Sequence, residues 1–177
     1  MAQHPIDKPA PLPNLSLMRP ILIALLAALL TGCAMSSLEA PESVRIESIT
    51  PRYMEAQQFI RVSEYWSGTE QTGSRLILRS DPQVRDGFYF VLRLDEKVKK
   101  LPRGTRILAE VFTPASPEAQ TFTFTLPAKR PRTKEIFVGL TGTDWNFPEA
   151  VPGAWRFTLE NANGDLLARE QSYLWEL

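Results

Sequence analysis

The residue types that most often carry enzyme chemistry are scarce in this sequence of 177 residues. It contains one histidine, His4, and one cysteine, Cys33. Imidazole and thiolate groups act as nucleophiles, as general bases and as ligands of zinc, haem iron and iron–sulfur clusters. A single cysteine also excludes an intrachain disulfide. Carboxylates, lysines and oxygen ligands for Ca²⁺ or Mg²⁺ are the groups that remain.

One segment combines carboxylates with an aromatic ring. Asp144 and Glu149 flank Trp145 in a stretch bounded by glycine and proline. An aromatic ring can stack on a sugar face, and a glycosidase uses two carboxyl groups at a set separation. Trp66 is a second aromatic residue that we consider for an exposed ligand-binding surface. For Trp145 we favour the alternative, a core residue that closes one end of the domain.

Cys33 directly follows an apolar segment that has a basic flank. Arg19 precedes ten consecutive apolar residues at positions 21–30. As a helix this run would be roughly 15 Å long, about half the hydrocarbon thickness of a bilayer. It is therefore too short to span a membrane and is typical of a secretory signal peptide. The alternative is a buried helix followed by an ordinary thiol, which the basic flank and the lack of a polar face disfavour.

The sequence Leu30-Thr31-Gly32-Cys33 resembles the lipobox of bacterial lipoproteins. The resemblance implies that Leu30, Thr31 and Gly32 form the signal peptidase motif. It also implies that Cys33 carries covalent diacylglycerol and an N-acyl chain, which together anchor far more firmly than one chain. In those proteins an Asp after the cysteine favours the inner membrane. Ala34 therefore favours the outer membrane, with the domain facing the periplasm.

Such processing would divide the chain into a signal region at 1–32, the lipidated cysteine and a polar tether at 33–43, and a domain at 44–177. Residues 1–17 contain four prolines, so we expect translation to begin at Met18. His4 would be removed and Cys33 consumed, and we therefore expect no enzyme activity, no metal site and no cofactor besides the lipid. The balance of 20 basic and 20 acidic residues gives no reason to expect nucleic acid as a partner. The expected partners are the membrane, through the lipid, and an envelope protein or glycan.

The domain region consists of short runs in which apolar and polar residues alternate. In the clearest run, Phe122, Phe124 and Leu126 alternate with threonines. Period-two alternation predicts half-buried strands, and no stretch after Cys33 keeps helical spacing over three turns. The runs are at 44–50, 76–79, 88–94, 106–111, 121–126, 136–140, 155–160 and 166–175.

Seven or eight such strands predict an antiparallel immunoglobulin-like β-sandwich, with a small barrel as the alternative. Residues 55–60 are left open between a helical turn and a strand. The segments 151–157 and 163–168 resemble the closing hairpin of an uncharacterised bacterial β-sandwich family. That resemblance implies a fold and no activity.

Two basic clusters lie in proline-containing connections between the expected strands. They comprise Lys97, Lys99, Lys100 and Arg103 in the first, and Lys129, Arg130, Arg132 and Lys134 in the second. They could meet anionic lipid, the phosphates of lipopolysaccharide or the carboxylates of peptidoglycan. We favour the alternative, in which they only solvate the connections.

The sequence thus predicts an envelope lipoprotein that acts as a non-enzymatic binding or assembly module. An envelope carbohydrate-binding or carbohydrate-active protein that uses Asp144, Glu149 and Trp145 is the first alternative. A structural spacer is the second.

Overall fold

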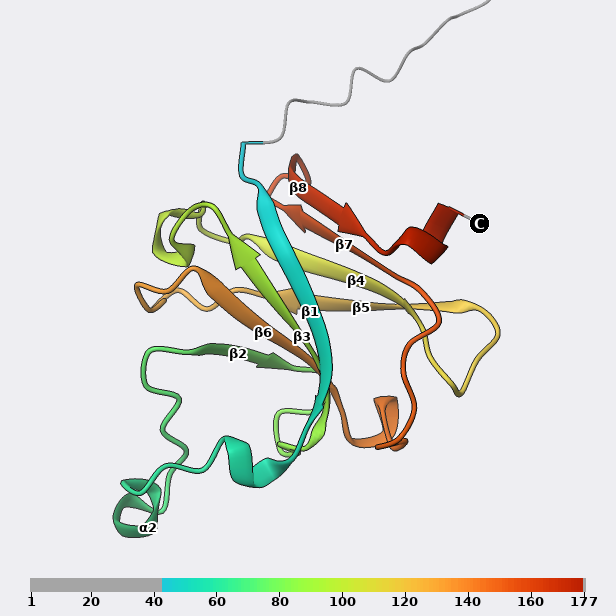
Figure 1. The fold of residues 1–177 in the computed structure, drawn as a ribbon. Helices are drawn as coiled ribbons and strands as arrows, with labels where there is room; N and C mark the ends of the chain where they lie inside the picture. The colour runs from blue at the N-terminus through green and yellow to red at the C-terminus, as the bar shows by residue number, and fades with distance from the viewer. Residues whose placement is uncertain (1–42, 177) are drawn as a thin grey trace, which may run out of the picture. The chain divides into compact units, whose positions relative to one another are not determined.

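The alternating segments form eight strands in two stacked sheets (Figure 1). The structure is a computed structural model and describes residues 43–176. The predicted signal region, the lipobox with Cys33 and the tether up to residue 42 lie outside the described residues. The strands are β1 Ile46–Met54, β2 Leu76–Arg79, β3 Gly87–Leu94, β4 Arg106–Phe112, β5 Ala119–Thr125, β6 Glu135–Thr141, β7 Trp155–Glu160 and β8 Leu166–Gln171.

The first sheet has the strand order β1-β3-β6-β2 and the second has the order β5-β4-β7-β8. The predicted fold class is confirmed as an immunoglobulin-like β-sandwich. The short helices are η1 Ala56–Gln58, α2 Glu64–Ser67, η2 Val98–Lys100, η3 Gly142–Asp144 and η4 Tyr173–Glu176. Among residues 43–176, no helix is long and apolar enough to cross a membrane.

One strand pair departs from the predicted antiparallel arrangement. β2 pairs with β6 in parallel, with Leu76 opposite Ile136 and Arg79 opposite Gly139, whereas the other pairs are antiparallel. The chain leaves β1 at one edge of the first sheet and reaches the opposite edge before it forms β2. A period of two shows that a segment is a strand, but it does not show the direction of its neighbour.

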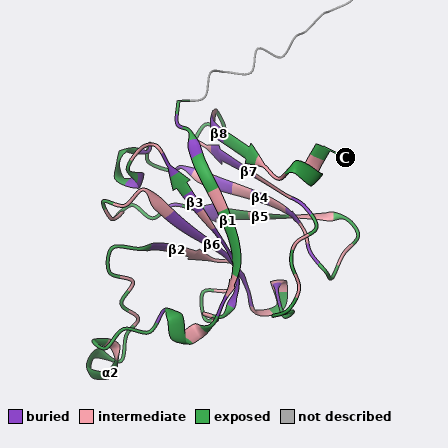
Figure 2. Ribbon diagram, viewed as in Figure 1, coloured by how far each residue is buried: buried purple, intermediate pink, exposed green. Residues whose placement is uncertain are grey.

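The main core lies between the two sheets, where Figure 2 shows the buried residues concentrated. Alternate residues of β3 and β4 point into it, including Phe90, Leu92, Ile107 and Val111, each of which has no exposed surface. Burial of one such side chain stabilises the fold by roughly 1.5–3 kcal/mol. The alternation predicted for these strands therefore places the correct face inward.

The first sheet also buries part of its outer face. A second cluster contains Met54, Phe59, Tyr89 and Phe137. The ring of Tyr89 lies against Gly139, where a Cβ atom would overlap the ring. Both faces of β3 are therefore buried at this position, and Phe59, from the connection between β1 and β2, helps to cover the outer face.

One local expectation needs correction, and one open alternative is decided by the structure. The last strand ends at Gln171, and residues 173–176 form the 3₁₀ turn η4, so the predicted strand to residue 175 is too long. The segment left open at 55–60 contains the 3₁₀ turn η1.

Candidate functional site

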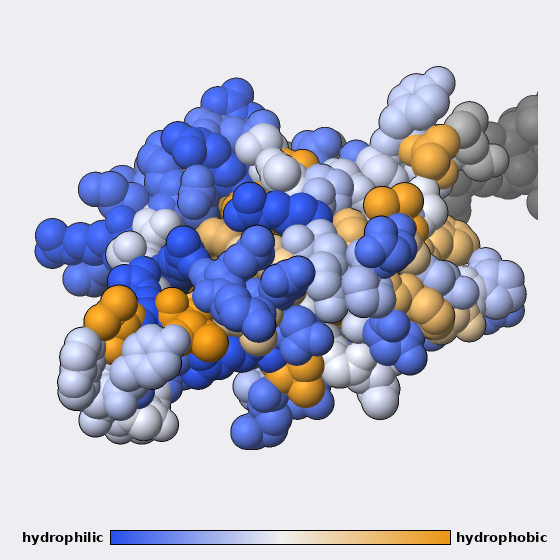
Figure 3. All heavy atoms as spheres, turned by 60° about the horizontal axis from the view of Figure 1, so that its bottom comes forward, coloured by the Kyte–Doolittle hydropathy of each residue, from blue (hydrophilic) through white to orange (hydrophobic). Residues whose placement is uncertain are grey.

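The connection between β1 and β2 carries several apolar side chains that are exposed to solvent and are not part of the core. We call residues 55–75 the aromatic loop. Tyr65 is 78% exposed and Trp66 is 80% exposed, and Ile60 and Val62 are exposed beside them in the sequence. The loop projects from the sandwich at the lower left of Figure 1. At the same corner in Figure 3, hydrophobic side chains lie next to paler ones and to strongly hydrophilic ones. Exposed apolar groups that gather in one place mark interaction surfaces.

Phe59 attaches the aromatic loop to the outer face of the first sheet. Its side chain is buried, and its ring centroid lies 4.8 Å from that of Tyr89. The guanidinium carbon of Arg79 lies 5.0 Å from the centroid of the Phe59 ring. Aromatic packing and a cation–π contact thus hold the start of the loop against β2 and β3.

Arg79 then joins the loop to the sheet by hydrogen bonds. Its guanidinium forms two bonds of 2.9 and 2.7 Å to the carboxylate of Glu70, and its Nε donates to the Tyr89 hydroxyl at 2.9 Å. That hydroxyl donates to the backbone carbonyl of Arg85 at 2.7 Å. The Arg79 side chain is only 7% exposed. Burial opposes its charge, but the hydrogen bonds that it donates to Glu70 and Tyr89 outweigh burial and raise the pKa of Arg79.

Glu64 fixes the position of α2, directly before the two exposed aromatic residues. One carboxylate oxygen accepts a bond of 2.7 Å from Arg85. The other accepts the backbone N–H groups of Gln71 at 3.1 Å and Arg61 at 3.3 Å. The bond from Gln71, followed by the Arg85 side chain, lowers the pKa of Glu64. The carboxylate therefore closes the loop across seven residues and ties it to the β2–β3 connection.

A glycine ends α2 and reverses the chain after the aromatic pair. Gly68 has φ of 64°, a left-handed conformation that costs little for glycine alone. Its N–H donates to the Glu64 carbonyl at 2.9 Å. The local sequence thus keeps Tyr65 and Trp66 in one short turn whose two ends are fixed.

The lowered pKa of Glu64 predicts that acid opens the loop. The carboxyl group binds a proton more readily in the open loop, where its pKa returns towards 4.5, than in the closed loop. The closed loop is therefore most stable above about pH 4.5 and loses stability as the pH falls through the lowered pKa. We expect hydrogen exchange at the amides of Arg61 and Gln71, corrected for intrinsic rates, to accelerate in that range. In Glu64→Gln the exchange should be fast already at pH 7 and should lack this pH dependence.

The structure does not support a sugar-stacking role for Trp145. Its side chain is 2% exposed, its ring centroid lies 4.6 Å from that of Phe88, and its indole N–H donates to the Phe147 carbonyl at 2.9 Å. The large apolar ring is buried because its single polar group finds a backbone partner. The core interpretation of this residue is therefore the correct one.

The two carboxylates beside Trp145 remain near the surface. Asp144 ends η3 and is partly exposed, and Glu149 is exposed. With the ring between them buried, the aromatic platform that we considered as an alternative for these three residues does not form. Within residues 43–176, no group of three or more His, Cys, Asp or Glu side chains lies close enough to hold a metal ion.

Of the four ligand-binding residues considered from the sequence, only Trp66 presents an aromatic ring at the surface. The sequence did not reveal the residues that position it, Glu64, Glu70, Arg79 and Arg85. They are spread over 22 positions without a common period, in the aromatic loop, in β2 and in the β2–β3 connection. The one available signal was the pair Tyr65-Trp66 followed by glycine in a charged segment that lacked a clear core pattern.

Comparisons with known proteins add little beyond the fold. No protein-family model and no curated protein sequence matches the chain. Among solved structures, an immunoglobulin-like protein from Pseudomonas aeruginosa is similar over 75% of this chain and 96% of its own chain. The two are 19% identical and superpose with a TM-score of 0.30.

Proposed function

We propose that this chain is a lipid-anchored, non-enzymatic module of the bacterial outer membrane that binds a protein of the cell envelope through the aromatic loop. The observation that carries the proposal is the exposure of Tyr65 and Trp66 on a loop that Arg79 and Glu64 hold in place. Tyrosine and tryptophan are the residues most enriched at binding hot spots. A loop that is already ordered loses little conformational entropy on binding.

The composition of the patch favours a protein over a glycan. Sugars stack on flat aromatic faces, whereas Ile60 and Val62 offer only branched aliphatic surface. Aliphatic side chains beside aromatic ones are suited to an apolar groove of a protein. The carbohydrate alternative depended on Trp145, whose ring is buried.

The arrangement of the domain fits a module that reaches away from its anchor. The lipobox resemblance implies that the acyl chains are on Cys33, ten residues before Ser43, which is the first residue that the structure describes. β1 then runs for nine residues to Met54, roughly 30 Å along the sandwich, before the aromatic loop starts. The loop is therefore at the end of β1 that lies farther from Ser43 (Figure 1).

Crosslinking in cells tests the partner. A photoreactive phenylalanine analogue at position 66 is expected to give a discrete protein adduct. Combining Tyr65→Ala and Trp66→Ala should reduce recovery of that partner with purified chain at least about 30-fold, because a hot-spot residue contributes about 2 kcal/mol or more. Tyr173, an equally exposed aromatic residue on η4, provides the control, since Tyr173→Ala should leave recovery unchanged. An adduct with glycan, or none, would contradict a protein partner.

Removal of the thiol tests the anchor. In Cys33→Ala we expect the chain to leave the outer-membrane fraction, because the acyl chains supply its membrane affinity at roughly 0.8 kcal/mol per buried methylene. Mass spectrometry of the wild-type chain should show the acyl chains on residue 33. Ser36→Ala, three residues further on, should stay in the membrane. A chain with a free Cys33 thiol that still carries residues 21–30 would disprove the anchor.

A further inference from the structure

The fold joins the two basic clusters that the sequence keeps 26 residues apart. Four side chains, Lys99, Arg103, Lys129 and Arg130, line one open hollow of about 600 Å³, together with Ala128. The two connections are bonded to each other. The Val98 N–H donates to the Thr133 carbonyl at 2.8 Å, and the Arg130 guanidinium donates to the Pro102 carbonyl at 3.1 Å. We call this hollow the basic hollow.

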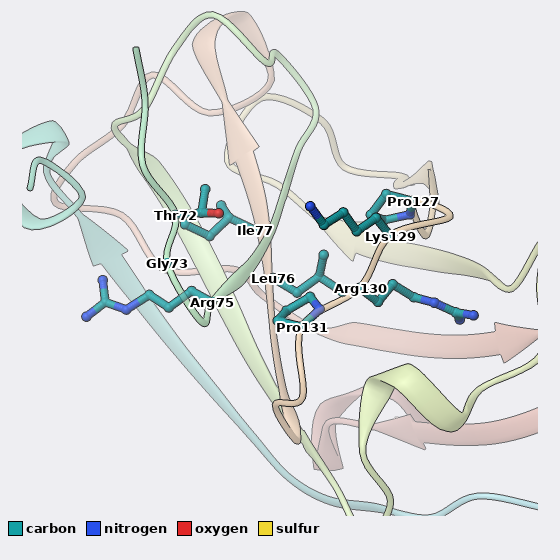
Figure 4. Close-up of a pocket in the computed structure, with 9 residues that line it drawn as sticks. All are labelled: Thr72, Gly73, Arg75, Leu76, Ile77, Pro127, Lys129, Arg130 and Pro131. Atoms are coloured by element: carbon teal, nitrogen blue, oxygen red, sulfur yellow. The ribbon is translucent and has the colours of Figure 1, made fainter. Parts of the chain in front are cut away.

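A second hollow of about 370 Å³ adjoins it and shares two of its cations. It lies between β2 and the connection after β5, and its lining includes Arg75, Lys129 and Arg130. In Figure 4, Lys129 reaches towards this hollow, whereas Arg75 and Arg130 extend outward on opposite sides of it. Lys129 and Arg130 thus connect the two hollows.

The positive charge of the basic hollow is not neutralised by the rest of the domain. Within the described chain, Lys99, Arg103, Lys129 and Arg130 form no ion pair. The acidic residues that precede the first cluster are already engaged. Glu96 pairs with Lys100 at 2.8 Å. The carboxylate of the neighbouring Asp95 accepts the backbone N–H of Arg45 at 3.0 Å.

Like charges held together in this way repel one another, and an anion would relieve the repulsion. The purely solvating role that we favoured from the sequence requires no such convergence of the two clusters. The convergence of the two clusters in the fold therefore favours anion binding, which neither cluster indicated by itself in the sequence.

The basic hollow lies at the tether end of the domain. Ser43 and Val44, the first two described residues, line a further hollow together with Lys100, Leu101 and Pro102. These last three residues occupy the positions between Lys99 and Arg103. The chain thus enters the domain beside the basic hollow. The ten residue steps from Cys33 to Ser43 span at most roughly 35 Å, so acyl chains at Cys33 would keep this end within reach of the bilayer.

We propose that the basic hollow docks the domain onto anionic phospholipid headgroups through their phosphate groups. The orientation of this contact rests on the lipid anchor proposed above, but the phosphate recognition does not. Acyl chains combined with a basic patch give two membrane signals on one end of a domain. Each Lys or Arg near an anionic surface strengthens binding by about fivefold. The aromatic loop, at the far end of β1, would then point away from the lipid.

The test uses the full chain in micelles of a neutral detergent, with phosphatidylglycerol or phosphatidylcholine added at increasing mole fraction. The readout is hydrogen exchange in peptides that cover 97–103 and 127–134. We expect phosphatidylglycerol, and not phosphatidylcholine, to slow exchange severalfold. The effect should vanish in 0.5 M NaCl, where the Debye length is below ~5 Å. Lys129→Glu should raise the half-maximal mole fraction at least about tenfold. Arg52→Glu, a matched reversal on exposed β1, should not change it.

Two results would overturn the proposal. One is equal protection by the two lipids, and the other is protection by free pyrophosphate as strong as that by phosphatidylglycerol, which would make the hollow a site for a soluble anion. The lipid is supplied in the micelle, so the same titration on Cys33→Ala separates this inference from the anchor. Protection that persists in Cys33→Ala would support the phosphate site independently of the anchor, and its loss in that variant would contradict a phosphate site that acts without the acyl chains.

Discussion

Replacing Trp145 with alanine is expected to lower the free energy of unfolding by about 3–5 kcal/mol, the range for removal of a large buried aromatic side chain. The ring fills the space beside Phe88, and its N–H group satisfies the Phe147 carbonyl. Alanine would leave a cavity and would remove one of the two hydrogen bonds that the Phe147 carbonyl accepts, the other coming from the backbone N–H of Ala150. Urea unfolding should show a lower midpoint with an unchanged slope, because the surface exposed on unfolding changes little.

Trp66 is the matched control for this prediction. It is the same residue type, but its ring is 80% exposed, so Trp66→Ala should change stability by less than about 0.5 kcal/mol. A Trp145→Ala chain that unfolds like the wild type would contradict the burial of this ring. Such a result, joined with a loss of glycan binding, would revive the carbohydrate alternative.

These two tryptophans show where sequence reasoning succeeds on this chain. The alternation in β3, β4 and β7 carries its own spatial information, because successive side chains of a strand point to opposite faces. Residues such as Phe157 and Leu159 are therefore placed in the core by spacing alone, and they are buried. Trp145 lies in a connection without periodicity, and only the general preference of large aromatic residues for the interior favoured its burial.

The parts that sequence reasoning missed depend on contacts between distant segments. The direction of β2 follows from the path of the chain across the first sheet, which no residue of Leu76–Arg79 encodes. Arg79 can pair with Glu70 only when β2 and the aromatic loop are both in their folded positions. The basic hollow likewise forms only when the β3–β4 and β5–β6 connections meet. In each case the residue types can be read from the sequence, but the distances between the residues cannot.

Arg79→Ala is expected to lower stability by roughly 3 kcal/mol, the lower part of the range for removing one partner of a buried ion pair. The Arg79 side chain is almost fully buried, but the Glu70 side chain is 26% exposed, and solvent can reach it after the loss. The Tyr89 hydroxyl also loses a donor, and Phe59 loses a cation that lies over its ring. Arg93→Ala is the control. It removes a guanidinium that contacts two carboxylates while 53% exposed, and it should cost less than about 1 kcal/mol.

The consequence for binding separates a preformed loop from one that orders on its partner. In Arg79→Ala the residues Tyr65 and Trp66 are unchanged, but the bonds that hold the loop to β2 are gone. If binding requires that the sheet order the aromatic loop in advance, partner recovery should fall several-fold at a temperature at which the sandwich is still folded. The loop must then become ordered during binding, and this reduces the net free energy of binding. Arg79→Lys should restore part of it, since lysine keeps the charge but cannot form the two parallel bonds to Glu70. Recovery that stays at the wild-type level in Arg79→Ala, with faster exchange at the Gln71 amide, would show that the partner itself orders the aromatic loop.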